Sequence, residues 1–257
     1  MTEPVSETVR VGTGAAARDI AMVSRAGLAP GLFWLGGFRS DMAGSKALAL
    51  DGLGAETGHA VTRFDYSGHG RSGGAFESGS ISRWLEEAVA VFATTTGPQV
   101  VVGSSMGGWL ALLLNRVLRR AGEPRIAALV LVAPAVDMTE DLMFAGFSGD
   151  DRLALLSRGY VELPSDYSSE PYRLTRTLIE DGRKHLLFGA SIETGCPVTI
   201  LQGGRDTDVP RAHAEKLVAH LTVDPVTLTL VPDGDHRLSR ERDLLLLRRV
   251  VRAALLP

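Results

Sequence analysis

The feature of this 257-residue chain that most constrains its fold is an alternation of short apolar runs with longer, helix-length segments. The apolar runs are rich in β-branched residues, as in VVVG, AALVLVAP and VTILQG. Runs of this kind are typical of parallel strands that are covered by helices on both faces of a sheet. The predicted strands are Leu32–Leu35, Ala60–Tyr66, Gln99–Gly103, Ala127–Ala133, Val198–Gln202 and Val226–Val231.

The segments between these runs are long enough to form crossover helices, which predicts an α/β fold with a mostly parallel central sheet flanked by helices. The first 28 residues are expected to add antiparallel strands at one edge of the sheet. The predicted helices are Ser45–Glu56, Ile81–Thr95, Met106–Ala121, Pro210–Leu221 and Arg240–Leu256.

One interval breaks this alternation, because over 60 residues separate the predicted strand that ends at Ala133 from the one that begins at Val198. That length is too great for a single crossover connection. Asp150–Arg158 and Tyr172–Leu187 are predicted as helices within it. We therefore expect one domain in three stretches, with the core in 1–135 and 197–257 and an inserted helical cap in 136–196.

Composition and charge exclude several functional classes. The net charge is −3 and there is no basic block, so neither nucleic acid nor an anionic membrane surface is an expected partner. The single cysteine, Cys196, cannot form an intramolecular disulfide, which is compatible with a reducing compartment.

Residues Met1–Val11 lack the pattern of a secretory signal, and no apolar stretch approaches the ~20 residues of a membrane span. A cytoplasmic location is expected.

The segment Gly103-Ser104-Ser105-Met106-Gly107 fits the pattern G-x-S-x-G in the context that the pattern requires. A predicted strand precedes it and a helix-like run, WLALLLNRVL, follows it. The glycines permit a sharp strand-to-helix turn that exposes the hydroxyl of Ser105, and the amino end of the helix favours developing negative charge. Ser105 is therefore the predicted nucleophile, whereas Ser104 lacks the matching glycine spacing.

A serine nucleophile needs a base and a carboxylate that orients the base. Of six histidines, only His236 follows a late predicted strand and leads into the last helix, while His69 lies in a glycine-rich loop expected to border the site. Asp206 and Asp208 both follow the strand VTILQ. Asp206 is the predicted orienting acid because it lies just beyond the strand, whereas Asp208 lies beside Pro210 and is expected to cap the next helix.

Two backbone N–H groups are expected to bind the oxyanion of a tetrahedral intermediate. One is that of Met106, directly after the nucleophile, and the other is that of Phe38, in the loop Leu35-Gly36-Gly37-Phe38. Glycines in such a loop let the backbone approach a substrate closely. No metal site is predicted, because the Asp and His residues lack metal-ligand spacing such as H-E-x-x-H, and no cofactor is expected.

The chain order of Ser105, Asp206 and His236, each after a strand, resembles the α/β-hydrolase superfamily over nearly the whole length. Asp65–Ser72 is similar to the D-x-x-G-x-G-x-S loop of that superfamily, and Asp206–Pro210 is similar to its D-x-x-V-P acid loop. Shorter segments resemble the group that holds the mitochondrial palmitoyl-protein thioesterase, also known as an acyl-glucuronide esterase, and its bacterial relatives. They are MAGSKA (42–47), RFDYSG (63–68), VGSSMGGW (102–109), LPSDYSS (163–169) and DHR (235–237).

This resemblance implies hydrolysis of carboxylic esters or thioesters of small acyl substrates through an acyl-enzyme on Ser105, without metal or cofactor. The chain departs from the group at Gly36, which stands where proline or histidine is usual. Three alternatives stay open: an amidase or peptidase with the same triad, a cofactor-free haloperoxidase or C–C hydrolase, and a non-catalytic binding protein.

Apolar cap residues are expected either to bind an acyl chain or only to dock the cap on the core. They are Leu142, Met143, Phe144, Phe147, Leu155 and Leu156.

Overall fold

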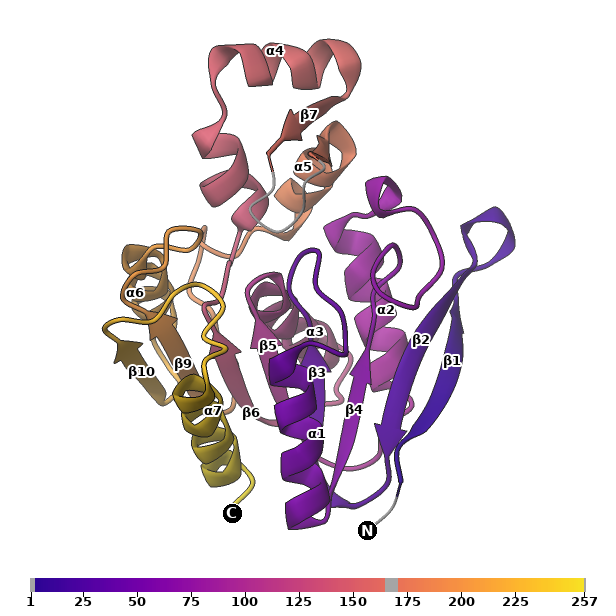
Figure 1. The fold of residues 1–257 in the computed structure, drawn as a ribbon, viewed down its shortest axis with the longest axis vertical. Helices are drawn as coiled ribbons and strands as arrows, with labels where there is room; N and C mark the ends of the chain where they lie inside the picture. Colours follow the sequence, from indigo (N-terminus) through magenta and orange to yellow (C-terminus); the bar gives the residue numbers. More distant parts are fainter. Residues whose placement is uncertain (1–2, 165–170, 257) are drawn as a thin grey trace.

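The computed structural model describes residues 3–164 and 171–256, and its eight-stranded sheet forms the centre of the molecule (Figure 1). The strands are β1 (Val5–Val11), β2 (Arg18–Arg25), β3 (Leu28–Leu35), β4 (His59–Phe64), β5 (Gln99–Ser104), β6 (Ile126–Val132), β9 (Val198–Gly203) and β10 (Val226–Val231). Their order across the sheet is β1-β2-β4-β3-β5-β6-β9-β10.

The pairs β1–β2 and β2–β4 are antiparallel, and every pair from β4 to β10 is parallel. The prediction of a mostly parallel sheet with antiparallel N-terminal strands at one edge is confirmed. The register brings the carboxyl ends of the parallel strands to one level. Leu35 pairs with Gly103, Ser104 with Val132, and Val132 with Leu201. The loops that follow these strands therefore emerge side by side.

Helices cover both faces of the sheet, as the continuous apolar runs predict. Helices α1 (Ser45–Thr57) and α7 (Glu241–Ala254) pack on one face, and α2 (Ile81–Phe92), α3 (Met106–Arg120) and α6 (Arg211–His220) pack on the other (Figure 1). The alternation of strand side chains divides the core in two: Val101 packs with α2 and α3, whereas Val100 and Val102 pack with α1 and α7. Among the described residues, no helix has the length and apolar character that crossing a membrane requires.

The insertion between β6 and β9 forms a cap at the end of the sheet where the parallel strands have their carboxyl ends (Figure 1). Its elements are a π turn (Thr139–Met143), 3-10 turns at Phe144–Gly146 and Arg183–His185, helices α4 (Gly149–Arg158) and α5 (Arg176–Gly182), and strands β7 (Tyr160–Leu163) and β8 (Tyr172–Thr175). The domain limits at 136 and 196 stay a prediction. Most of the segment LPSDYSS lies outside the described residues.

The prediction of one helix over Tyr172–Leu187 is wrong at both ends. Residues Tyr172–Thr175 pair antiparallel with β7, with Leu174 buried and Arg173 exposed, which is the two-residue alternation of a strand. Helix α5 begins only after Thr175, whose side chain accepts a hydrogen bond from the backbone N–H of Leu178, and it ends at Gly182. The cap is therefore a mixture of helices and a small sheet rather than helices alone.

Candidate active site

Ser105 occupies the turn between β5 and α3 with φ 54° and ψ −119°, a backbone conformation that residues with a side chain rarely adopt. The flanking glycines are sterically required. A Cβ on Gly103 would lie 2.3 Å from the carbonyl oxygen of Gly107, and a Cβ on Gly107 would lie 2.0 Å from that of Leu35. This geometry explains why the sequence has glycine on both sides of the serine, and it places Ser105 at the carboxyl end of the central strand.

The structure brings together the three side chains that the sequence predicted as a triad. His236 Nε2 lies 3.1 Å from Ser105 Oγ, and His236 Nδ1 lies 2.9 Å from Asp206 Oδ2, both within hydrogen-bond range. The Asp206 side chain is fully buried and that of His236 is 19% exposed. A continuous hydrogen-bonded chain thus runs from a buried carboxylate to the hydroxyl of Ser105 at the carboxyl end of β5.

Hydrogen bonds to Asp206 fix the orientation of His236. Asp206 Oδ1 accepts from the backbone N–H groups of Asp208 (3.0 Å) and Val209 (2.8 Å), and Oδ2 also accepts from Gln202 Nε2 (3.1 Å). These bonds show that the Asp206 oxygens act as acceptors, so His236 must be the donor in its bond to Asp206 and its Nδ1 carries a proton. The lone pair of Nε2 then faces the hydroxyl of Ser105. Sequence reasoning missed Gln202, although a polar residue at the end of the apolar run VTILQ is a usable signal.

The predicted role of Asp208 as a helix cap is wrong. Helix α6 begins at Arg211 with Pro210 at the N-cap position and no side-chain cap bond, so Asp208 precedes the helix by too many residues. Among the described residues, Asp206, Asp208 and His236 form the one group with three potential metal-ligand atoms within 4.8 Å of one another. A cation there would have to displace the donors that already bind Asp206.

The loop after β3 runs directly against the turn that holds Ser105. A Cβ on Gly37 would lie 3.3 Å from Ser105 Cβ and 3.3 Å from the carbonyl oxygen of Ser104. Within residues 3–164 and 171–256, the backbone N–H groups of Phe38 and Met106 donate no hydrogen bond to the protein. Both groups are therefore available to a substrate, which is compatible with their predicted role in an oxyanion hole.

The glycine-rich loop after β4 supports the loop after β3. The carboxylate of Asp65 accepts hydrogen bonds from the backbone N–H groups of Met42 (2.6 Å) and Arg71 (2.8 Å). Burial raises the pKa of Asp65, against the lowering effect of these two hydrogen bonds. A Cβ on Gly70 would lie 2.2 Å from an Asp65 oxygen, which explains the second glycine of the motif. His69 also contacts the loop after β3, through the backbone of Arg39.

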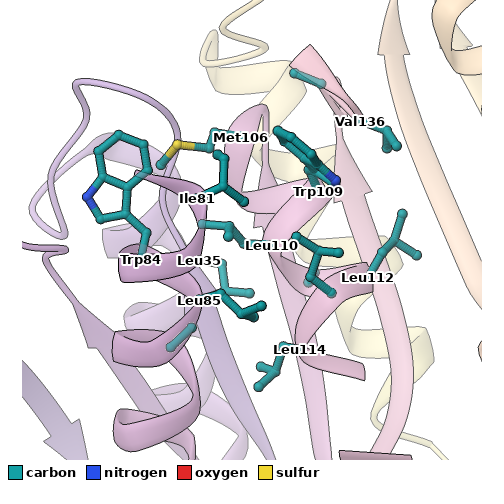
Figure 2. Close-up of a cluster of buried hydrophobic side chains, with 14 of the residues drawn as sticks. Leu35, Ile81, Trp84, Leu85, Met106, Trp109, Leu110, Leu112, Leu114 and Val136 are labelled. Carbon is teal, nitrogen blue, oxygen red and sulfur yellow. The ribbon is translucent and has the colours of Figure 1, made fainter. Parts of the chain in front are cut away.

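The apolar residues of the cap mostly serve to dock it. Phe147 and Leu155 are buried in the core cluster, whereas Leu156 is 68% exposed. Leu142, Met143 and Phe144 pack against the same cluster while remaining partly accessible. Beneath the cap lies a buried apolar layer in which Ile81 and Trp84 of α2 stand beside Met106 and Trp109 of α3 (Figure 2). Binding of an acyl chain by the cap stays a prediction.

Residues 28–248 match the model of the "Alpha/beta hydrolase family". The chain is 33% identical over 225 residues to mitochondrial palmitoyl-protein thioesterase ABHD10 of Bos taurus, covering 86% of this chain and 71% of that protein. A crystal structure of a protein from Agrobacterium vitis S4, provisionally assigned as a hydrolase, matches with 49% identity and a TM-score of 0.96, over 98% of this chain and 99% of that one. Mouse alpha/beta hydrolase domain-containing protein 10 matches with 28% identity and a TM-score of 0.84, over 96% and 97%. These matches confirm the predicted α/β-hydrolase fold.

Proposed function

Since this chain belongs to the alpha/beta hydrolase family, we propose that it is a serine hydrolase that cleaves carboxylic ester or thioester bonds of small acyl substrates. The observation that carries the proposal is the hydrogen-bonded chain from Asp206 through His236 to Ser105, with the serine in a strained turn. A binding protein without catalysis has no need of an aligned base or of strained backbone at one serine.

In the first half of the proposed reaction, His236 Nε2 accepts the hydroxyl proton of Ser105 while Oγ attacks the acyl carbon. The carbonyl oxygen becomes an oxyanion, to which the N–H groups of Met106 and Phe38 donate. Removal of one such donor typically lowers kcat by ~10²–10³-fold, so this contact is a large part of catalysis. The amino end of α3 adds a favourable partial charge at the same place.

In the second half, the imidazolium of His236 gives its proton to the departing alcohol or thiol as the bond to the acyl carbon breaks. The acyl group is then esterified to Ser105. Water attacks this ester while His236 Nε2 takes a proton from the water, and the serine recovers its proton as the carboxylic acid leaves. Asp206 holds the imidazole in position and stabilises its protonated form in both halves.

The relatives support an ester or thioester substrate in preference to an amide. ABHD10 of Bos taurus, at 33% identity, is named for hydrolysis of a palmitoyl thioester on protein. A thiolate or alkoxide leaves more easily than the anion of an amine, so cleavage of an ester or thioester depends less on protonation of the leaving group than cleavage of an amide does. The amidase or peptidase alternative therefore becomes an outcome of the substrate comparison below.

The test is labelling by a fluorophosphonate probe, with Ser105→Ala as the variant and Ser104→Ala as its matched control. Ser104 is the adjacent buried hydroxyl, but His236 bonds to Ser105. We expect labelling of the wild type and of Ser104→Ala, and none of Ser105→Ala. Folded wild-type protein that resists the probe would contradict the proposal.

A panel of p-nitrophenyl esters, acyl thioesters and matched anilides of increasing chain length then defines the substrate class. We expect esters and thioesters to turn over much faster than anilides. Preferential cleavage of the anilides would assign the chain as an amidase.

A further inference from the structure

His69 is a buried residue, 4% exposed, whose two ring nitrogens both bond to backbone. Its Nδ1 lies 3.1 Å from the carbonyl oxygen of Ser67, a contact that requires the proton to be on Nδ1. Nε2 therefore has a lone pair, and the backbone N–H of Arg39 donates to it over 3.1 Å. The hydrolytic steps proposed above use neither nitrogen.

Arg39 directly follows Phe38 in the loop after β3 and has a φ of 57°, in the left-handed region that residues with a side chain avoid. The N–H of Ser40 donates to the carbonyl oxygen of Gly37 over 3.2 Å, which closes a turn around Phe38 and Arg39. A strained residue persists only where its surroundings over-determine it. The hydrogen bond from the Arg39 N–H to His69, in the loop after β4, helps to hold Arg39 in this strained conformation.

The position of His69 is itself fixed by aromatic packing. Its ring centroid lies 5.3 Å from that of Phe76 and 5.3 Å from that of Trp84. The ring of Phe38 packs on the same two side chains, at 5.0 Å and 6.0 Å. Trp84 Nε1 donates to the same carbonyl oxygen of Ser67 that binds His69, over 3.2 Å. His69 and Phe38 are thus held by one rigid cluster.

We propose that His69 is a positioning residue for the oxyanion hole, whose Nε2 holds the Arg39 peptide so that the adjoining Phe38 N–H faces the carbonyl oxygen of the substrate. This inference rests on the proposed hydrolase function. Peptide groups one residue apart in a tight turn cannot rotate independently, so loss of the Arg39 bond would turn the Phe38 N–H away from the site. Oxyanion donors are effective only when they are in place before charge develops.

The chemistry of His69 suits this role, because only the neutral ring offers an acceptor to Arg39. A protonated ring would present a second N–H to the N–H of Arg39. Burial of His69 lowers its pKa, and the charge of the Arg39 guanidinium lowers it further, against a raising effect of the bond to Ser67. The acceptor is thereby preserved at neutral pH.

Three variants separate the acceptor from the ring. His69→Gln places an amide oxygen where Nε2 lies and keeps the bond to Arg39. His69→Asn reaches only the position of Nδ1, and His69→Phe keeps the ring without any acceptor. With a good ester or thioester substrate, we expect kcat of the Gln variant within about threefold of wild type. We expect kcat of the Asn and Phe variants to fall ~10–100-fold with little change in KM, since one oxyanion donor is misplaced.

A trifluoromethyl ketone supplies a second readout, because Ser105 adds to it and forms a stable tetrahedral oxyanion. Across the variants, log Ki for this inhibitor should rise in proportion as log kcat/KM falls, as expected when only transition-state stabilisation changes. Rates are expressed per active site titrated with fluorophosphonate, so misfolded protein does not count. The matched control is His59→Phe, since His59 Nδ1 also bonds to a backbone carbonyl, that of Pro30, but at the opposite end of the sheet. It should leave kcat and Ki unchanged.

The outcomes distinguish this inference from the function on which it rests. Wild-type protein that neither binds the probe nor turns over any substrate would refute both. Turnover by wild type, together with unchanged kcat and Ki in His69→Phe, would overturn the positioning role alone. Equal losses in the Gln and Phe variants would also overturn it, because the missing acceptor would not then be the cause.

Discussion

The strain at Ser105 predicts that Ser105→Gly leaves the protein more stable than Ser105→Ala does. Ser105 has a φ of 54°, so its Cβ is held in an unfavourable position. Ser105→Gly and Ser105→Ala both remove the hydroxyl that bonds to His236. The difference in stability between these two variants therefore reports the backbone strain and not the lost hydrogen bond.

The magnitude follows from two opposing terms. A residue with a side chain in such a conformation costs ~1–3 kcal/mol, which glycine avoids. Glycine also makes the unfolded chain more flexible, which destabilises the folded state by ~0.5–1 kcal/mol relative to alanine. The difference between these terms is ~0–2.5 kcal/mol, so we expect Ser105→Gly to exceed Ser105→Ala in free energy of unfolding by about 1 kcal/mol. For a chain of this size, about 1 kcal/mol corresponds to a Tm about 2–4 °C higher.

Urea unfolding followed by circular dichroism measures this difference. Ala49→Gly in α1 provides a control, because Ala49 is inside a regular helix and outside both core clusters, and there we expect a loss of ~0.5–1 kcal/mol. Both Ser105 variants should be inactive toward the fluorophosphonate probe. A glycine variant no more stable than the alanine variant would refute the reasoning that the nucleophile turn is strained.

Three further predictions concern Asp206, a half-buried lysine and the single thiol. Asp206→Asn should lower kcat per folded enzyme by ~10⁴-fold, because an amide can donate to His236 and select the wrong tautomer. Circular dichroism would confirm that the fold is kept, and a near-normal kcat would contradict the proposed role of Asp206. Burial lowers the pKa of Lys46 to about 8, so between that pH and the usual lysine range the unfolded chain binds more protons than the folded chain, and stability from this group rises with pH. The stability of wild type relative to Lys46→Met, measured by urea unfolding, should therefore be greater near pH 10 than near pH 7, and an equal or smaller difference would argue against it. Burial raises the pKa of the Cys196 thiol to about 11, so alkylation by iodoacetamide near pH 8 should be roughly 100-fold slower in the folded protein than in urea, and similar rates would show that the thiol is accessible.

The main features of the fold and the grouping of Ser105, Asp206 and His236 could be predicted because each has a local signal. The continuous apolar runs VVVG and VTILQG indicate strands buried on both faces, and β5 and β9 each have a parallel neighbour on both sides. Polar residues just after such strands must meet, because parallel strands end at one edge. The register confirms this, since Val132 pairs with both Ser104 and Leu201. Ser105 and Asp206 follow β5 and β9 and therefore lie at the same end of the sheet.

Two predictions failed where local patterns allow more than one reading. Tyr172–Thr175 is a strand because it pairs with β7, and a four-residue segment has too little periodicity to distinguish this from a helix. Asp208 stands near a proline and a helix start, which is a favourable context for a cap. The loop instead turns so that its backbone N–H binds Asp206. The contact that decides the structure of Tyr172–Thr175 is with a strand outside that segment, whereas the contact that decides the loop at Asp208 is with Asp206, two residues away.

The hydrogen bond that joins His69 to the loop after β3 could not be predicted, because it connects two loops that are distant in the sequence. His69 meets Arg39 across thirty positions, and nothing near either residue specifies the other. Glycines behave differently. A Cβ on Gly103 would meet Gly107 of the same turn, and a Cβ on Gly107 would meet the carbonyl oxygen of Leu35 at the end of β3, yet both requirements appear in the sequence as glycines of one short pattern. At Gly37 the loop pattern also predicts a glycine, while the atoms that would crowd its Cβ belong to Ser104 and Ser105, far away in the sequence. A steric requirement thus shows in the sequence as a glycine even when the atom that causes it is remote. A histidine such as His69 occurs in many environments, so its presence does not reveal which N–H group it binds.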